Sequence, residues 1–179
     1  MRVTGGTYAE YSSNPKLNAF LSIIEKKIIE NKKKALIFHH LVSDGELIVK
    51  HLKKQFKGIR IAEFRGAISE TEKTHYYEEW QKGNIDVVVA HPNSAGQSLD
   101  FYQSDTIIYY SRDYSFRSNL QSRGRIIRKG QTKQCFFYHL YAMYTIDEII
   151  MHSLQQNESN FVKLTKDKLI REACKIYKK

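Results

Sequence analysis

Two arginines and a glutamine in the last third of the chain have the side chains needed to bind phosphate. They lie in the segment Gln121-Ser-Arg-Gly-Arg125-Ile-Ile-Arg128-Lys-Gly-Gln131. Arg125 and Arg128 are three residues apart, nearly one helical turn, so a helix over 115–129 would project both from one face. Planar, permanently charged guanidinium groups suit phosphate oxygens, and the spacing predicts a phosphate clamp. A basic helix that lies on solvent or on nucleic acid is the alternative.

A second set of candidates follows segments with strand-like sequences. The small residues Ser94, Ala95 and Gly96 allow a close approach of backbone to a ligand, and Asp100 comes shortly after them. Other polar residues in comparable positions are His39, His40, Arg65, Gly66 and Arg112. For the two histidines, phosphate contact and a pair satisfied within the fold are equally good interpretations.

Helical and strand-like patterns alternate along the chain and would position these residues. Strands separated by single helices favour a parallel sheet covered by helices on both faces, an α/β fold. Ligands in such sheets lie beyond the carboxyl ends of the strands, and we expect the arginine pair to face that edge. The predicted strands are 35–38, 59–64, 85–90, 105–110 and 134–141, and the predicted helices begin at Asn14-Pro15, Ser43-Asp44, Ser69, Ser115 and Thr145.

Composition limits the class of protein. A chain of 179 residues with 41% apolar residues can build one continuous core. Its formal net charge of +10 favours a polyanionic partner. Cys135 and Cys174 are too few for a disulfide framework, so a reducing compartment is expected. With neither a signal peptide nor an apolar run near the roughly 20 residues of a membrane span, the expected location is the cytoplasm, that of a bacterial or phage-infected cell included, or the nucleus.

Several catalytic motifs are absent from the sequence. No G-x-x-x-x-G-K-[ST] phosphate loop occurs, because Gly5-Gly6-Thr7 lacks both the spacing and the lysine. The pair Asp147-Glu148 belongs to a predicted capping box, Thr145 with Glu148, and is not expected to bind Mg²⁺. The seven histidines show no metal-binding spacing, and no metal site is predicted. Alone, the chain is expected to hydrolyse essentially no ATP.

Several segments, in order, resemble the second motor lobe of superfamily 2 helicases, most closely the Swi/Snf-type DNA translocases and their phage relatives. The Gln121–Gln131 segment resembles motif VI, and His91–Phe101 resembles motif V. Motif IV is matched by 34–39, the intervening R/D-G-x-x-S segment by 65–69, and the element after motif VI by 145–150. The resemblance covers roughly 14–157. Residues 1–13 resemble a bridge from a preceding lobe, and 158–179 are expected to form a Lys-rich C-terminal helix.

The resemblance implies a three-layer RecA-like fold that supplies half of an ATP site. Arg125 and Arg128 would be arginine fingers at the γ-phosphate, with Gln121 orienting that edge. Gly96 and Asp100 would lie near the nucleotide, although relatives usually have Asn where this chain has Asp100. ATP with Mg²⁺ would be held mainly by a P-loop lobe, present in cis or in trans.

The resemblance also implies contacts with DNA, which we expect to be double-stranded. Ser94 and Ala95 would face a phosphate, and further contacts would come from His39, Arg65, Gly66 and Arg112. The alternative function is a noncatalytic basic α/β module that binds nucleic acid through the phosphate backbone alone, without linkage to ATP.

Overall fold

The computed structural model describes residues 14–155, except residues 67, 93, 95–98 and 114. The predicted bridging segment 1–13 and the predicted C-terminal helix 158–179 lie outside these described residues. Among the described helices, none is both long and apolar enough to cross a lipid bilayer.

The first helical segment begins as the sequence predicts. The Asn14 side chain accepts a hydrogen bond from the Leu17 amide, 3.0 Å, and Pro15 occupies the first position of helix α2, Pro15–Ile23. The helix then widens into a π-helix, η1, Ile24–Ile29. Such segments are rare and commonly occur at functional sites. The apolar stripe of α2 and η1 packs into the core.

Five parallel strands form one sheet in the order β2-β3-β1-β4-β5, which confirms the predicted parallel α/β architecture. Their bounds are β1 Ala35–Phe38, β2 Ile61–Phe64, β3 Val87–Ala90, β4 Thr106–Tyr109 and β5 Phe136–His139. Phe38 is in register with both Ala90 and Tyr109, so the loops that follow these strands leave from the same edge. The central strands β1, β3 and β4 are buried at every residue.

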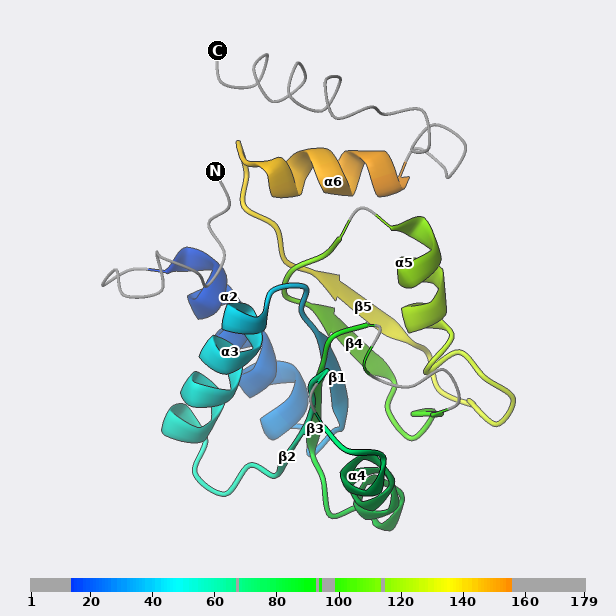
Figure 1. Ribbon diagram of the computed structural model, residues 1–179. Coiled ribbons are helices and arrows are strands. Elements are labelled where there is room, and N and C mark those ends of the chain that lie inside the picture. Colours follow the sequence, from blue (N-terminus) through cyan, green and yellow to red (C-terminus); the bar gives the residue numbers. More distant parts are fainter. Residues whose placement is uncertain (1–13, 67, 93, 95–98, 114, 156–179) are drawn as a thin grey trace.

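Helices cover both faces of the sheet and complete three layers (Figure 1). On one face, α2, η1 and α3, Val42–Gln55, pack on a cluster that includes Ile37. On the other face, α4, Glu70–Lys82, packs on a cluster that includes Leu36 and Trp80. Ile126, which follows α5, belongs to the same cluster. Neighbouring residues of one strand enter opposite clusters because side chains alternate along a strand. The remaining helices are α5 Phe116–Arg123 and α6 Ile146–Gln155.

Helix α4 has the ends that the sequence predicts. The Ser69 hydroxyl accepts from the Glu72 amide, and the Glu72 carboxylate accepts from the Ser69 amide, which is a complete capping box. Gly83 ends the helix with φ 86°, a conformation that glycine adopts without steric cost. The second predicted box differs in its partners, because Thr145 Oγ1 accepts from the Asp147 amide and Glu148 accepts from the Tyr144 amide.

The predicted cap of α3 is wrong. The helix begins at Val42 with Leu41 as its N-cap, two residues earlier than a Ser43 cap predicts. Asp44 is fully buried inside the first turn, where its carboxylate accepts a 2.5 Å hydrogen bond from the Ser111 hydroxyl. A tertiary partner beyond β4 therefore replaces the local capping role of this carboxylate.

The predicted extent of α5 is also wrong, because the helix ends at Arg123 and not at residue 129. Gly124 caps it, and the amides of Arg125 and Ile126 bond to carbonyls three residues back, as in a tight turn. The Arg125 carbonyl accepts instead from the Phe101 amide, 2.9 Å. This bond draws the chain out of the helix, and the two arginines do not project from one helix face.

Candidate functional site

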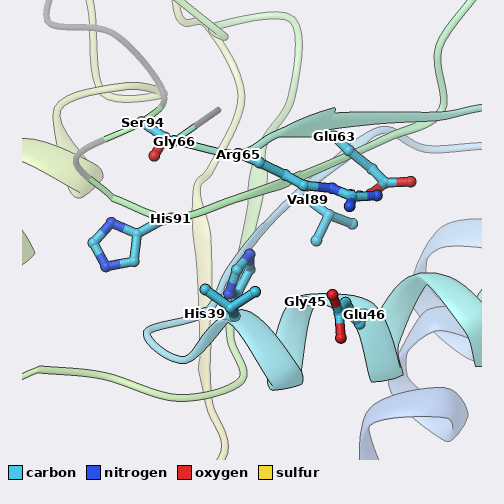
Figure 2. A pocket seen from close by; sticks show the side chains of 10 residues that line it. His39, Gly45, Glu46, Glu63, Arg65, Gly66, Val89, His91 and Ser94 are labelled. Carbon is cyan, nitrogen blue, oxygen red and sulfur yellow. Dashed lines mark hydrogen bonds and ion pairs between the residues drawn. The ribbon is translucent and has the colours of Figure 1, made fainter. Parts of the chain in front are cut away.

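The carboxyl ends of β1, β2 and β3 open onto a pocket of about 270 Å³, here called the carboxyl-edge pocket (Figure 2). It brings together four of the predicted nucleic-acid residues, which come from three separate loops. They are His39, Arg65, Gly66 and Ser94. The rest of its lining is Val42, Gly45, Glu46, Glu63, Val89 and His91. Sequence reasoning missed Glu46 and Glu63, and the only signal for Glu63 was a charged residue within an otherwise apolar strand.

Arg65 and Ser94 lie on adjoining loops at this pocket. The Arg65 side chain is 57% exposed and pairs with Glu63, its Nε donating to Oε2 over 2.8 Å. Gly66 brings the two loops together, since a Cβ atom placed there would lie 3.9 Å from the Ser94 hydroxyl oxygen. An exposed guanidinium suits a phosphate group of a nucleic-acid backbone, although here it points toward Glu63 and not toward Ser94 (Figure 2).

His39 is buried in this pocket, with 6% of its surface exposed. Its Nδ1 donates to the Leu41 carbonyl over 2.8 Å, and its ring lies against Gly45, where an added Cβ would come within 2.6 Å of Cε1. Burial lowers the pKa of His39, which keeps the ring neutral. A neutral, buried ring fixes the start of α3 against β1. This geometry does not favour the predicted phosphate contact by His39.

His91 lines the same pocket and lies next to His40, with 5.6 Å between ring centroids. Burial, and then the neighbouring His40, lower the pKa of His91. Both effects disfavour a second positive charge at this position. Arg65 is consequently the cation among the predicted residues of the carboxyl-edge pocket.

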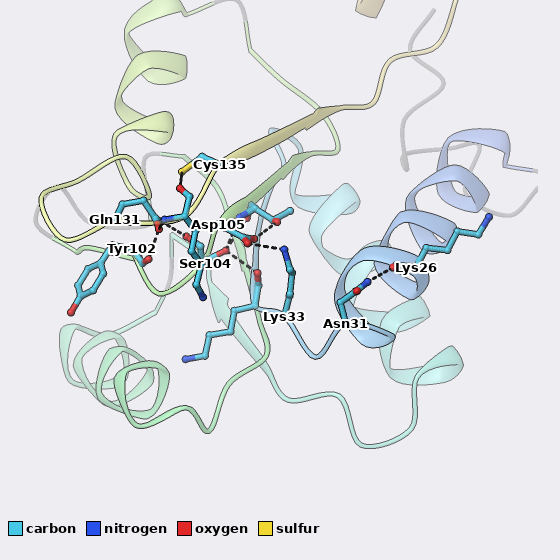
Figure 3. A network of polar contacts seen from close by, with 11 residues as sticks. Lys26, Asn31, Lys33, Tyr102, Ser104, Asp105, Gln131 and Cys135 are labelled. Carbon is cyan, nitrogen blue, oxygen red and sulfur yellow. Dashed lines mark hydrogen bonds and ion pairs between the residues drawn. The ribbon is translucent and has the colours of Figure 1, made fainter.

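The segment 124–131, here called the arginine loop, lies near the amino end of β4. Gln131 Nε2 donates to the carbonyls of Tyr102 and Ser104, at 3.0 and 2.9 Å, and Ser104 is two residues before β4 (Figure 3). The expectation that the arginine pair faces the carboxyl edge is therefore wrong. The physical reason is the crossover, because α5 must run back along the sheet from the end of β4 to the start of β5.

Arg125 is the buried arginine of this loop, with 5% of its surface exposed. Its Nη1 donates to the Leu99 carbonyl over 3.1 Å, so the side chain holds the segment before β4. Burial chiefly lowers the pKa of Arg125, nearby Arg128 lowers it further, and Asp100 opposes both. The guanidinium remains charged, because folded proteins do not deprotonate arginine.

Arg128 carries the more exposed guanidinium of the loop, with 45% of the side chain accessible. Its Nε lies 2.9 Å from Asp100 Oδ1 and donates to the Gly124 carbonyl over 3.0 Å. The structure thus joins two residues that sequence analysis placed in separate motifs. Asp100 lies beside the predicted phosphate-binding arginine, where its carboxylate pairs with the guanidinium.

Gln121 lies on the exposed side of α5, one turn before the arginine loop. The adjoining residues on the chain are unusually apolar for exposed positions. Leu120 is 57% exposed, and Ile127, next to Arg128, is 53% exposed.

Arg112 does not join the carboxyl-edge pocket. Its guanidinium lies over the Tyr109 ring, 4.4 Å from the centroid, with Nη1 3.0 Å from His139 Nδ1. It also donates to Asn119 of α5. Burial lowers the pKa of Arg112. The side chain therefore links β4, β5 and α5 in the described conformation, and its nucleic-acid contact stays a prediction.

Two predicted residues, Ala95 and Gly96, lie outside the described residues. Within the described part of the chain, no three His, Cys, Asp or Glu side chains come together as a metal-binding group.

The chain is similar to one known protein family and to several solved structures. Residues 15–130 match the model of the helicase conserved C-terminal domain, which includes the arginine loop up to Gly130. The chain is 26% identical over 163 residues to the chromatin-remodeling ATPase INO80 of Eremothecium gossypii, and 27% identical over 135 residues to that of Mycosarcoma maydis. These alignments cover 85% and 74% of this chain, but 11% and 7% of the relatives.

Solved structures show the same fold. The C-terminal part of the Fun30 ATPase domain superposes with a TM-score of 0.74 and 18% identity, covering 90% of this chain and 52% of that one. The helicase domain of Pyrococcus furiosus Hef superposes with a TM-score of 0.62 and 26% identity, covering 79% of this chain and 28% of that one. The chain therefore spans about half or less of each protein to which it is similar.

Proposed function

Because the chain belongs to the helicase conserved C-terminal domain family, as the C-terminal RecA-like lobe of a Swi/Snf-type helicase, we propose that it is the second half of an ATP-dependent DNA motor. The observation that carries the proposal is the half-exposed Arg128 within the matched domain. A P-loop lobe, in cis or in trans, would bind most of the ATP and its Mg²⁺. Without that lobe, this chain would turn over essentially no ATP.

Arg128 is the arginine finger that the geometry supports best. Its exposed guanidinium would exchange its contacts with Asp100 and the Gly124 carbonyl for a γ-phosphate, whose charge exceeds that of a carboxylate. ATP would supply the transferring phosphoryl group, and the arginine would stabilise the charge that develops on it. Gln121 is exposed one turn earlier and would orient the same edge. The exposed Leu120 and Ile127 would face the P-loop lobe.

Arg125 would act differently in this proposal. Its guanidinium is buried on the Leu99 carbonyl, so it holds the segment that contains Asp100. Arg125 would reach a phosphate only after its hydrogen bond to the Leu99 carbonyl is broken. We therefore assign Arg128 the direct contact in the described conformation, and Arg125 the positioning of its surroundings.

The test is DNA-stimulated ATP hydrolysis by the two-lobe protein. Arg128→Ala should reduce turnover by about 10³ to 10⁵, the range for arginine fingers in other nucleoside triphosphatases. Arg125→Ala should also abolish turnover. Lys129→Ala is the matched control, since this exposed cation lies in the same loop and should leave turnover unchanged. Near-normal turnover in both arginine variants would refute the assignment.

The carboxyl-edge pocket would bind the DNA backbone. The exposed Arg65, which lines the same pocket as Ser94 and Gly66, supports a phosphate contact at this edge. The isolated chain should bind duplex DNA with an affinity that falls steeply as salt rises. Arg65→Ala should lower the slope of log K against log salt by about one. Arg60→Ala is the control, because Arg60 is a similarly exposed, acid-paired arginine near the start of β3.

Two results separate this motor from a noncatalytic nucleic-acid module. Salt-dependent DNA binding together with loss of ATPase in Arg128→Ala supports the motor. DNA binding that persists while no P-loop lobe gives DNA-dependent ATP hydrolysis supports the module instead.

A further inference from the structure

A basic hollow lies at the opposite edge of the sheet from the carboxyl-edge pocket. It measures about 460 Å³ and lies between the end of η1 and the end of α3, next to the residues that lead into β1 and β3. We call it the amino-edge groove. Apolar side chains line part of it: Ile28, Ile29, Phe56 and Ile59. Charged side chains and one glycine line the rest: Lys32, Lys33, Lys57, Gly58, Arg60 and Asp86.

The groove carries an excess of positive charge. Its one acidic lining residue, Asp86, is occupied by Arg60, with Nη2 at 2.5 Å from Oδ1 and Nε at 3.0 Å from Oδ2. Lys33 pairs with Asp105, 2.8 Å away. Within the described residues, neither Lys32 nor Lys57 pairs with an acid. Both are exposed, so two ammonium groups border the groove without a counter-charge from this part of the chain.

The groove also exposes apolar surface. Ile29 is 38% exposed, and Phe56 and Ile59 are partly buried against the core. Residues with left-handed backbone conformations flank this apolar surface on both sides. Lys32 has φ 50° three residues after the π-helix, and Gly58 has φ 86° three residues after α3. A left-handed conformation is unfavourable for lysine, and it places this lysine at a sharp turn beside the apolar floor.

We propose that the amino-edge groove binds an acidic peptide segment of a partner protein. Carboxylates of the segment would pair with Lys32 and Lys57, and one large apolar side chain would cover Ile29 and Phe56. A nucleic-acid backbone fits less well, because phosphates gain nothing from an apolar floor and are bound chiefly by charge and hydrogen bonds. A site at this edge lies apart from the carboxyl-edge pocket, so both can be occupied together.

The direct test uses the 179-residue chain and a fluorescently labelled short peptide with two acidic residues on each side of a phenylalanine. The measurement is fluorescence anisotropy. The double variant Lys32→Glu/Lys57→Glu should bind about tenfold more weakly or worse, since each exposed pair contributes up to about fivefold and reversal adds repulsion. Lys54→Glu is the matched control, because it makes the same charge change on the exposed part of α3 outside the groove. It should bind the peptide as the parent chain does.

Two further measurements test the apolar floor and the partner class. Replacing the peptide's phenylalanine by alanine, or Ile29 by serine, should weaken binding several-fold. The proposal is overturned if these changes have no effect, or if Lys54→Glu weakens binding as much as the double variant. It is also overturned if duplex DNA binds through Lys32 and Lys57 and displaces the peptide, because the groove is then a nucleic-acid site.

Discussion

Acidification should destabilise the fold through His139 on β5. The imidazole stacks on Tyr109, with 4.9 Å between ring centroids, and its Nδ1 lies 3.0 Å from Arg112 Nη1. The guanidinium can only donate, so Nδ1 must accept and the ring must be neutral. Burial first, then the charges of Arg112 and Arg123, lower the pKa of His139 to about 4. Protonation would put two donors against each other.

The sign and size of the effect follow from proton linkage. Because the folded-state pKa is about 4 and the unfolded value is about 6.5, the unfolded chain binds more protons between these limits. Stability from His139 is complete above pH 6.5 and is lost as the pH falls toward 4. A difference of about 2.5 units corresponds to roughly 3.4 kcal/mol at 1.36 kcal/mol per unit. Since the ring is only partly buried, we expect about 2 kcal/mol.

Urea unfolding of the chain at a series of pH values between 4 and 7.5 measures this loss. His139→Asn keeps an acceptor near the position of Nδ1 but cannot be protonated, so its free energy of unfolding should fall less steeply with acid. The lowered pKa values of His39 and His91 affect both proteins alike and cancel in the difference. His75→Asn, at an exposed site on α4, should follow the parent curve. Parallel curves for the parent and His139→Asn would refute the reasoning.

Two other predictions concern the contacts that join distant segments. Asp147→Ala should lower the free energy of unfolding by about 3–5 kcal/mol, because it leaves the Lys16 ammonium, 2.6 Å away and 3% exposed, buried without its partner. In urea titrations, the double variant Lys16→Met/Asp147→Leu should regain most of the lost free energy of unfolding. If Asp147→Ala costs no more stability than breaking the exposed Lys82–Glu79 pair, the buried ion pair is contradicted. Gln131→Glu should destabilise the chain by about 1–3 kcal/mol, because a carboxylate cannot donate to the Tyr102 and Ser104 carbonyls. Thermal or urea unfolding equal to that of the parent chain would show that Gln131 does not hold the arginine loop.

Local patterns in the sequence were sufficient to predict most of the fold. The apolar runs at 35–38 and 85–90 contain strands that are buried at every residue, and the alternation of strands with helices predicted their parallel arrangement. The Ser69 capping box and Gly83 fixed both ends of α4. These signals succeed because each depends on neighbours within about four residues of the chain.

The failed predictions share a different cause, which is competition from distant partners. A helix through Arg125 was reasonable by spacing, but the Arg125 carbonyl accepts from Phe101, 24 residues earlier. Asp44 was a good local cap, but Ser111 binds its carboxylate inside the fold. The contacts of Arg112 with Tyr109 and with His139, 27 residues later, were not predicted either. No local pattern contains these partners, so sequence reasoning over a short window could not find them.

The two candidate sites lie at different edges of the sheet, so any coupling between them would have to cross it. The carboxyl-edge pocket and the arginine loop lie at opposite ends of the strands, and α5 runs from one end to the other. Arg112 follows β4 at the first end and donates to Asn119 within α5, while Gly124 leads from the same helix into the arginine loop. In the proposed motor, a displacement of the segment after β4 that contains Arg112 would reach the arginine loop along this one short helix.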